Sequence, residues 1–350
     1  MSPRPLTIVG GGLSGLTLAL ALRRQEVPVT VIESGSYPRH RVCGEFLSGR
    51  GQDILEDLGL NEACDAAGAR AAETARFASP RRLGRSLMLP RPALCLSRHA
   101  LDALLARELV AQGGILRTGE RVPDGPLPAG TIRATGRRPA TGQATGPWRW
   151  FGVKAHARQV QLDADLELHA GPQGYAGFCR LGDGVVNVCA LFRRRIGSAG
   201  EPARSPADWL RGVPGTPWAE RMAGAELDPA SLCTVGGLEL RPWHDADGAE
   251  LRLGDALTMI PPVTGNGMSL ALESAALAAG PLSAYARGEV DWVAARDAVA
   301  HAARRTFAGR LRAAAWLQRA LFLPSAPALL LHLTGCSDRL WQRLFAVTRG

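Results

Sequence analysis

The sequence is short of the features that mark membrane-spanning, disulfide-rich and zinc-binding proteins. It has no uninterrupted apolar run of about 18 residues, the length a membrane-spanning helix needs, so we expect no transmembrane segment. Its 7 cysteines form no CxxC pair and are odd in number, which argues against a disulfide framework and against a zinc site. We therefore predict no bound metal and a reducing, cytoplasmic environment.

Lysine is almost absent as well, because Lys154 is the only one and the remaining basic residues are arginines. The net charge is +9, but the arginines are spread along the chain without interleaved aromatic residues and no nucleic-acid module is recognisable. We expect no nucleic-acid partner. With 350 residues and 46% hydrophobic content, the chain can bury a large core and form two domains.

Residues 6–33 follow a strand, turn, helix, strand pattern that ends in an acid. Gly10, Gly12 and Gly15 have GxGxxG spacing, which permits a tight turn, close approach of a pyrophosphate and close packing of helix on strand. The helix N-terminus offers free N–H groups to phosphates. Glu33 lies where a carboxylate accepts from ribose hydroxyls and disfavours a 2′-phosphate. The pattern indicates a dinucleotide site; a glycine-rich turn of an unrelated α/β protein is the alternative.

The rest of the chain alternates between helical and strand-like segments. Residues 96–114 read as a helix capped by Ser97, whereas residues 75–96 read as short antiparallel strands separated by prolines. Several period-2 segments between residues 148 and 253 predict a second, sheet-rich domain with a helical stretch near residues 206–225. Residues 282–350 are expected to be helical.

Three motifs in this order resemble the FAD-dependent oxidoreductases that share the para-hydroxybenzoate hydroxylase fold. They are GGGLSG with Glu33; Ser97 and Arg98 opening a helix; and Gly254-Asp255 followed by PPVTGNG at residues 261–267. The stretches YPRHRVCGEFLS (37–48) and GYAGFCRLGDGVVNV (174–188) are similar to the geranylgeranyl reductase branch. The resemblance covers roughly residues 5–285.

This resemblance implies the fold and its division into domains. The expected fold is α/β, with a Rossmann-like FAD-binding domain interleaved with a mostly antiparallel β-sheet substrate domain and followed by C-terminal helices. We assign residues 1–74, 95–140 and 250–283 to the FAD-binding domain. Residues 75–94 and 141–249 form the substrate domain, and residues 284–350 form the helical segment.

The resemblance also implies the residues that hold FAD. Asp255 corresponds to the acid that binds a ribityl hydroxyl, and Arg98 to a ribityl or pyrophosphate contact; a helix cap and a solvated arginine are the respective alternatives. Residues 265–267 correspond to the turn beneath the flavin ring. The full set of predicted cofactor-binding residues is Gly10, Gly12, Leu13, Ser14, Gly15, Glu33, Ser34, Arg41, Cys43, Arg98, Gly254, Asp255, Pro262, Gly265, Asn266, Gly267 and Met268.

Four residues are candidates for catalysis. Lys154 and His156 are two apart, so both project from one face of a strand and can meet the substrate chamber, unless that face is exposed to water. Tyr175 can donate its hydroxyl in the chamber or pack in the core. Cys43 lies in the loop that approaches flavin and substrate in the resembling branch; Arg41 beside it can lower a thiol pKa, although we expect no cysteine nucleophile and packing is equally possible.

The expected activity is that of an FAD-dependent oxidoreductase, with hydride transfer to or from a C=C bond of an apolar, isoprenoid- or polyketide-like molecule. The alternative is an FAD-dependent monooxygenase of an aromatic or polyketide-type substrate. The Asp-Gly pair with which related enzymes handle NAD(P)H is replaced by Thr135-Gly136, which argues against direct use of NAD(P)H. NAD(P)H and a separate electron donor both stay open. Trp148 and Trp150 are not followed by the Ile-Pro of flavin halogenases, which argues against halogenation. We expect a monomer or a weak homodimer. Contact with a membrane surface is a further possibility that the sequence leaves open.

Overall fold

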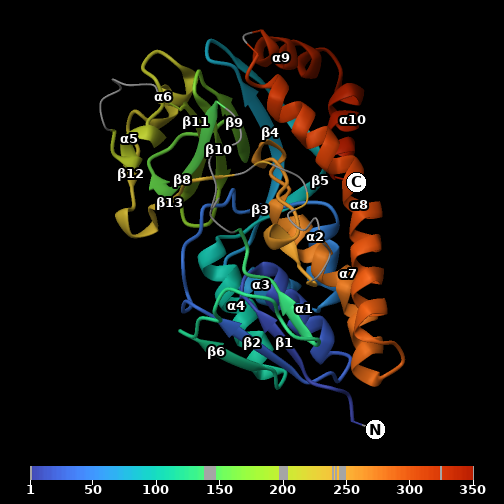
Figure 1. Cartoon of the computed structure of the whole chain (residues 1–350). Coiled ribbons are helices and arrows are strands. Elements are labelled where there is room, and N and C mark those ends of the chain that lie inside the picture. Colours follow the sequence, from blue (N-terminus) through green and yellow to red (C-terminus); the bar gives the residue numbers. More distant parts are fainter. Residues whose placement is uncertain are drawn as a thin grey trace.

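A computed structural model describes residues 2–137, 147–196, 204–238, 240, 243, 250–323 and 325–349. The described elements form a four-stranded sheet with its helices, a larger second sheet, and a C-terminal set of helices along one side (Figure 1). The fold class expected from the sequence is confirmed.

The first sheet is parallel and contains the glycine-rich segment. Its strand order is β6-β2-β1-β7, so the first two strands of the chain lie in the middle. Apolar residues alternate through β1 and β2, and helix α1, which is buried along most of its length, connects them as a parallel crossover must. The bounds are β1 Leu6–Val9, α1 Leu13–Arg23, β2 Val29–Glu33, β6 Ile115–Thr118 and β7 Thr131–Arg133.

Two helices from distant parts of the sequence pack on α1. The helix α4 (Arg98–Ala111) begins at the predicted cap, where the Ser97 hydroxyl accepts from the Ala100 N–H at 3.1 Å. The helix α7 (Gly267–Arg287) follows the segment 254–266 and also contacts α1 and α2 (Arg50–Asp57). This packing brings the third motif against the first.

The second sheet is larger and mostly antiparallel. Its order is β12-β8-β11-β10-β9-β4-β5-β3, with β13 also paired to β8, and among the described strands of this sheet only β4 and β9 pair in parallel. The bounds are β3 Phe46–Leu47, β4 Arg70–Ala78, β5 Leu83–Cys95, β8 Trp148–Arg158, β9 Leu166–Ala170, β10 Gly174–Arg180, β11 Val186–Arg195, β12 Glu226–Leu227 and β13 Cys233–Val235. Three short helices lie between these strands in the chain: α3 (Asn61–Ala66) precedes β4, and α5 (Pro206–Leu210) and α6 (Pro217–Met222) lie between β11 and β12.

The C-terminal helices connect the two sheets. The helix α8 (Trp292–Ala320) packs on α7 and runs from the first sheet toward the second, where α9 (Ala326–Cys336) and α10 (Asp338–Arg349) contact it or the strands β4 and β5 (Figure 1). None of the helices in the described ranges combines the length and apolar character that crossing a membrane requires.

Candidate active site

The glycine turn after β1 is shaped by close backbone contacts. Gly10 has φ +109°, and a Cβ there would lie 2.3 Å from the Ala134 carbonyl oxygen. A Cβ on Gly15 would lie 2.0 Å from the Gly10 carbonyl oxygen, so helix and strand touch at this point. Gly12, in contrast, would meet nothing within 4 Å and is the N-cap of α1, which no side chain caps. The turn is therefore closed on the protein side and open where an anion would approach.

Glu33 closes this unit as a buried carboxylate held from several sides. It accepts from the N–H groups of Gly11 and Gly35, both at 2.7 Å, and from Arg39 at 2.6 Å. Burial alone would raise the pKa of Glu33, but these donors and the Arg39 charge outweigh it and lower the pKa to about 2. The Ser34 hydroxyl donates to the same carboxylate at 3.2 Å. Glu33 is therefore ionised at neutral pH; Arg39, six residues later in a loop, was not singled out from the sequence.

The segment 254–268 lies against this turn. Gly254, at φ +56°, has no room for a Cβ because the Ser14 hydroxyl oxygen would be 2.7 Å away, and its N–H donates to the Ser274 hydroxyl at 3.0 Å. Gly265, at φ +63°, packs on the ring of Phe46. Asn266 is the buried N-cap residue of α7. Two segments far apart in the sequence thus meet at one place.

One cavity of about 1030 Å³ runs past both segments and on to the second sheet. Most of the predicted cofactor-binding residues line it, namely Gly12, Leu13, Ser14, Glu33, Arg41, Cys43, Arg98, Asp255, Pro262, Gly265, Gly267 and Met268. The others do not line it: Gly10, Gly15, Gly254 and Asn266 are buried, and Ser34 is exposed. The open position at Gly12, the ionised acid and the uncapped helix end fit a bound dinucleotide.

The far part of the cavity is an apolar chamber between β8–β11 and the C-terminal helices. Tyr175, one of the catalytic candidates, lies in its wall, and its hydroxyl donates to the Gln318 side-chain oxygen of α8 at 2.8 Å. Gln318 is itself buried, and the sequence did not point to it. The sheet contributes small or aliphatic residues and the helices contribute larger ones: Gly152, Leu168, Gly177, Cys189, Leu191, Trp316, Leu317, Leu321 and Trp341.

Arg98 and Cys43 both line the cavity. The Arg98 guanidinium makes two hydrogen bonds, of 2.6 and 2.8 Å, to Asp102 one helical turn later, a fully buried carboxylate. Burial raises the pKa of the Cys43 thiol, although the Arg98 charge opposes this effect. The expected influence of Arg41 on this thiol is wrong, because Arg98 supplies the nearby charge and burial outweighs it.

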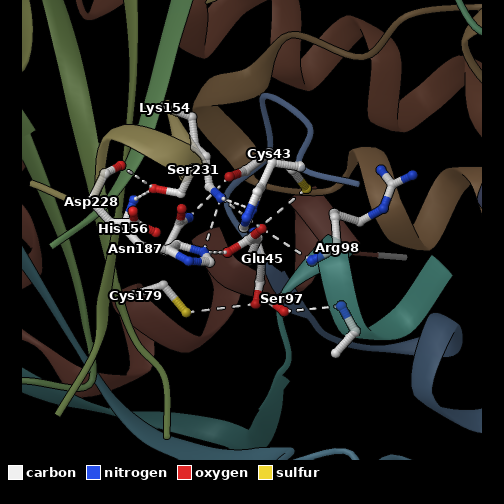
Figure 2. A network of polar contacts seen from close by, with 12 residues as sticks. Cys43, Glu45, Ser97, Arg98, Lys154, His156, Cys179, Asn187, Asp228 and Ser231 are labelled. Carbon is white, nitrogen blue, oxygen red and sulfur yellow. Dashed lines mark hydrogen bonds and ion pairs between the residues drawn. The ribbon is translucent and has the colours of Figure 1, made fainter. Parts of the chain in front are cut away.

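Lys154 and His156 form a buried polar group with two residues of the loop before β3 (Figure 2). The Lys154 amine lies 3.2 Å from Glu45 Oε1, 2.9 Å from His156 Nε2 and 3.2 Å from His40 Nδ1. His156 Nε2 is also 2.6 Å from Glu45 Oε2. Lys154 and Glu45 have no exposed surface and His156 has 13%, so the alternative of a water-exposed face is wrong.

Three side chains of this group are of the types that bind metal ions, but the Lys154 amine lies between them. The ligand atoms of His40, Glu45 and His156 all lie within 4.8 Å of one another. The Lys154 amine is within 3.2 Å of each of the three side chains, so a lysine nitrogen takes the central position. We assign these residues to a proton-bearing cluster instead of a metal centre.

Comparison with known proteins agrees with this geometry. Residues 4–145 match the family described as FAD binding domain. The N-terminal part of this chain is an FAD-binding domain. The match makes FAD the cofactor of this chain, in agreement with the glycine turn and the ionised Glu33.

Two curated proteins illustrate the relationship. Tryptophan 2-halogenase of Chondromyces crocatus is 24% identical over 338 residues, which cover 85% of this chain and 64% of the relative. 6-Methylpretetramide 4-monooxygenase of Streptomyces rimosus is 32% identical over 136 residues, covering 31% of this chain and 32% of the relative. The chain thus matches less than two thirds of the length of these relatives.

Solved structures share the fold across nearly the whole chain. The flavin-dependent brominase Bmp2 has a TM-score of 0.75 at 19% identity, covering 99% of this chain and 94% of that chain. A geranylgeranyl bacteriochlorophyll reductase-like protein from Thermoplasma acidophilum also has a TM-score of 0.75, at 18% identity, covering 98% of this chain and 96% of that chain. Neighbours with this fold thus include both flavin-dependent halogenases and a reductase-like protein, so the expected fold is confirmed and the reductase branch is not established.

Proposed function

We propose that this chain is an FAD-dependent monooxygenase that acts on an electron-rich aromatic or polyketide-type molecule. The observation that carries this proposal is the single cavity that joins the dinucleotide turn at Gly12 to an apolar chamber at Tyr175. The curated relatives support oxygen-dependent chemistry over the C=C reduction that the sequence first suggested, since they are named as a halogenase and a monooxygenase.

The residues that hold FAD in this proposal are those that converge on the near part of the cavity. The Gly12 backbone and the N-terminus of α1 would receive the pyrophosphate, Glu33 the ribose and Asp255 the ribityl chain, while residues 265–268 would lie beneath the ring. When bound and reduced, FAD supplies the two electrons with which O₂ and two protons convert a substrate C–H into C–OH and water.

The chain's own contribution is to exclude water, orient the substrate and supply protons. The aliphatic and aromatic lining favours an apolar ligand, and Gly177 leaves room above the sheet because a Cβ there would meet only the Cys189 carbonyl oxygen, at 3.8 Å. Tyr175 and Gln318 offer a polar contact in an otherwise apolar wall. Cys43 stays a neutral thiol in the cavity lining, because burial raises its pKa. Lys154 and His156 act from behind the wall.

Halogenation is the second candidate, because the halogenase relative aligns with 85% of this chain. The segment that carries Trp148 and Trp150 opposes it: the tryptophans continue into Phe151 and Gly152 instead of the Ile-Pro that we expect in halogenases. Trp150 packs edge-on against Phe322, with 5.2 Å between the ring centroids, so this ring belongs to the contact with the C-terminal helices.

The deciding experiment reconstitutes the protein with FAD, reduces it anaerobically, and adds O₂ with an aromatic probe such as indole, with and without bromide. An added oxygen atom in the product supports the proposal, a brominated product formed only with bromide supports the second candidate, and reduction of a C=C bond without O₂ would return the reductase hypothesis. A Gly177→Trp variant is expected to retain FAD and lose turnover, because the new tryptophan side chain fills the chamber. Gly177→Ala is the control for this variant. A protein that binds no FAD would overturn the proposal.

A further inference from the structure

In the group around Lys154, one nitrogen atom, His156 Nε2, has two hydrogen-bonding neighbours that make opposite demands on its proton. His156 Nε2 lies within hydrogen-bonding distance of both the Lys154 amine, at 2.9 Å, and Glu45 Oε2, at 2.6 Å. A single ring nitrogen either donates to the carboxylate or accepts from the amine, but it does not do both. The proton between His156 and Glu45 therefore has two positions, and the Lys154 hydrogen bonds change with it.

Glu45 is held as the anion of this group. Burial favours its neutral form, but the hydrogen bond from His156 and the Lys154 charge outweigh burial and lower the pKa of Glu45. Glu45 Oε1 also accepts from the Arg98 N–H at 3.0 Å, which orients the carboxylate from the start of α4. A buried ammonium beside this carboxylate is thus compensated in charge, and its proton can leave only along a hydrogen bond.

His40 is the member of the group that lines the cavity. Its Nδ1 faces the Lys154 amine at 3.2 Å, and because an ammonium can only donate, Nδ1 is then the acceptor and the ring proton sits on Nε2. Burial, together with the charges of Lys154 and His156, lowers the pKa of His40 to about 4, so the ring is neutral near pH 7. Its face stacks on His99 of α4, with 4.5 Å between the centroids, which fixes the ring plane.

We propose that Lys154 is a buried proton donor for the cavity and that His40 is the residue through which it acts. The Nε2 proton of His40 passes to a basic atom of the ligand while Nδ1 takes a proton from the Lys154 ammonium. The ammonium becomes an amine, the ring stays neutral, and one proton is gained by the ligand. The catalytic use of this relay rests on the proposed function, in which oxygenation consumes protons inside an apolar chamber.

Other titratable groups near Lys154 do not replace this route. Cys189 on β11 and Cys233 on β13 lie opposite Lys154 in the sheet register, and burial raises the pKa of both thiols, so they remain neutral. The Arg98 guanidinium is already bound to Asp102. Arg41 borders the cavity and, as a guanidinium, stays protonated.

The test uses the fact that Lys154 is the only lysine of the chain. Protein grown with lysine labelled with ¹⁵N and ¹³C gives one side-chain NMR signal, so the protonation state of Lys154 and the exchange of its Nζ protons with water are read without assignment. Neither ligand nor FAD turnover is needed. The relay predicts measurable exchange despite complete burial, and in His40→Phe, which keeps the stack on His99, a rate lower by about tenfold to a hundredfold.

Two variants keep the result interpretable. His40→Gln retains a polar side chain without a two-nitrogen ring and is expected to slow exchange as His40→Phe does, provided both variants melt near the wild-type temperature. His99→Phe is the matched control, because it preserves ring stacking and does not contact Lys154; its exchange rate should equal that of the wild type. Equal exchange in His40→Phe and wild type, or no exchange in the wild type, would overturn the relay.

Turnover is measured separately so that the two proposals fail separately. In reconstituted enzyme that oxygenates a probe, His40→Phe should lower kcat by the same order of magnitude as the exchange rate and leave FAD affinity unchanged. Exchange that depends on His40 in a protein without oxygenase turnover would leave the relay standing and reject the proposed function. Unchanged kcat in His40→Phe, in an active enzyme, would remove the relay from the reaction.

Discussion

Gly12→Ala separates FAD binding from folding more cleanly than any other change in the glycine turn. The backbone of Gly12 has φ −86° and ψ −172°, which alanine adopts, and the added Cβ would meet no atom within 4 Å. The cost to the folded protein is limited to replacing a glycine N-cap by alanine, about 0.5–1 kcal/mol. The methyl group would nevertheless stand in the cavity where the pyrophosphate must approach the backbone.

The loss of binding follows from the hydrogen bonds that this approach makes. Charge-assisted bonds from backbone N–H groups contribute about 1.5–3 kcal/mol each, so losing one raises the Kd for FAD about tenfold to a hundredfold. Flavin fluorescence titration measures the Kd, and urea unfolding of the FAD-free protein measures stability.

Gly15→Ala is the contrasting variant. Its Cβ would lie 2.0 Å from the Gly10 carbonyl oxygen, so the helix must move and the FAD-free protein should lose about 3 kcal/mol or more of stability. Wild-type FAD affinity in Gly12→Ala would refute the assignment of this turn to the pyrophosphate. A large loss of stability in Gly12→Ala would refute the open geometry of this turn.

Three further predictions test the charges and polar groups around the cavity. Arg310 of α8 and Glu273 of α7 form a buried ion pair with two hydrogen bonds. In urea unfolding, Arg310→Met alone should lower the free energy of unfolding by about 3–5 kcal/mol, and the double variant with Glu273→Leu should recover most of that loss. Additive losses in the double variant would contradict this prediction. The pKa of Glu33 falls from 4.5 to about 2 on folding, so the free energy of unfolding of the FAD-free protein should decrease by about 2–3 kcal/mol as the pH drops from 4.5 toward 2. In urea unfolding measured across this pH range, Glu33→Gln should show a flatter dependence on pH, and an equal dependence in both proteins would contradict the prediction. Tyr175→Phe leaves the Gln318 oxygen without its donor and should cost about 1–2 kcal/mol in thermal unfolding while FAD affinity stays unchanged; weaker FAD binding would place this tyrosine at the cofactor instead.

The dinucleotide half of the fold could be predicted because its signals are local. Glycine spacing, helix capping and apolar periodicity each act within a few residues, and the structure places β1, α1, β2 and the Ser97 cap where these signals indicate. For the second sheet the residues predicted a set of strands, and the resemblance added that they are mostly antiparallel. Period-2 alternation shows which side chains share a face but not which strands are neighbours, so the parallel pairing of β4 with β9 had no signal.

The candidate site shows the same division. Lys154 and His156 could be paired from their spacing on one strand, but their partners come from a loop more than 100 residues earlier. Loops carry no periodicity, so neither His40 nor Glu45 could be placed. The expectation that polar residues at alternate positions face water failed here because an anion from that loop compensates the buried ammonium.

The backbone at Glu45 indicates why that anion is present. Glu45 has φ +60°, a left-handed conformation that costs a residue with a Cβ about 1 kcal/mol and that glycine would adopt freely. A glycine at this position would relieve the backbone but leave the Lys154 ammonium buried without its carboxylate, at a cost of about 3–5 kcal/mol. The second term exceeds the first, so the buried lysine accounts for a glutamate in a glycine conformation. The strain at Glu45 and the burial of Lys154 are therefore two consequences of one requirement, a compensated proton donor behind the cavity wall.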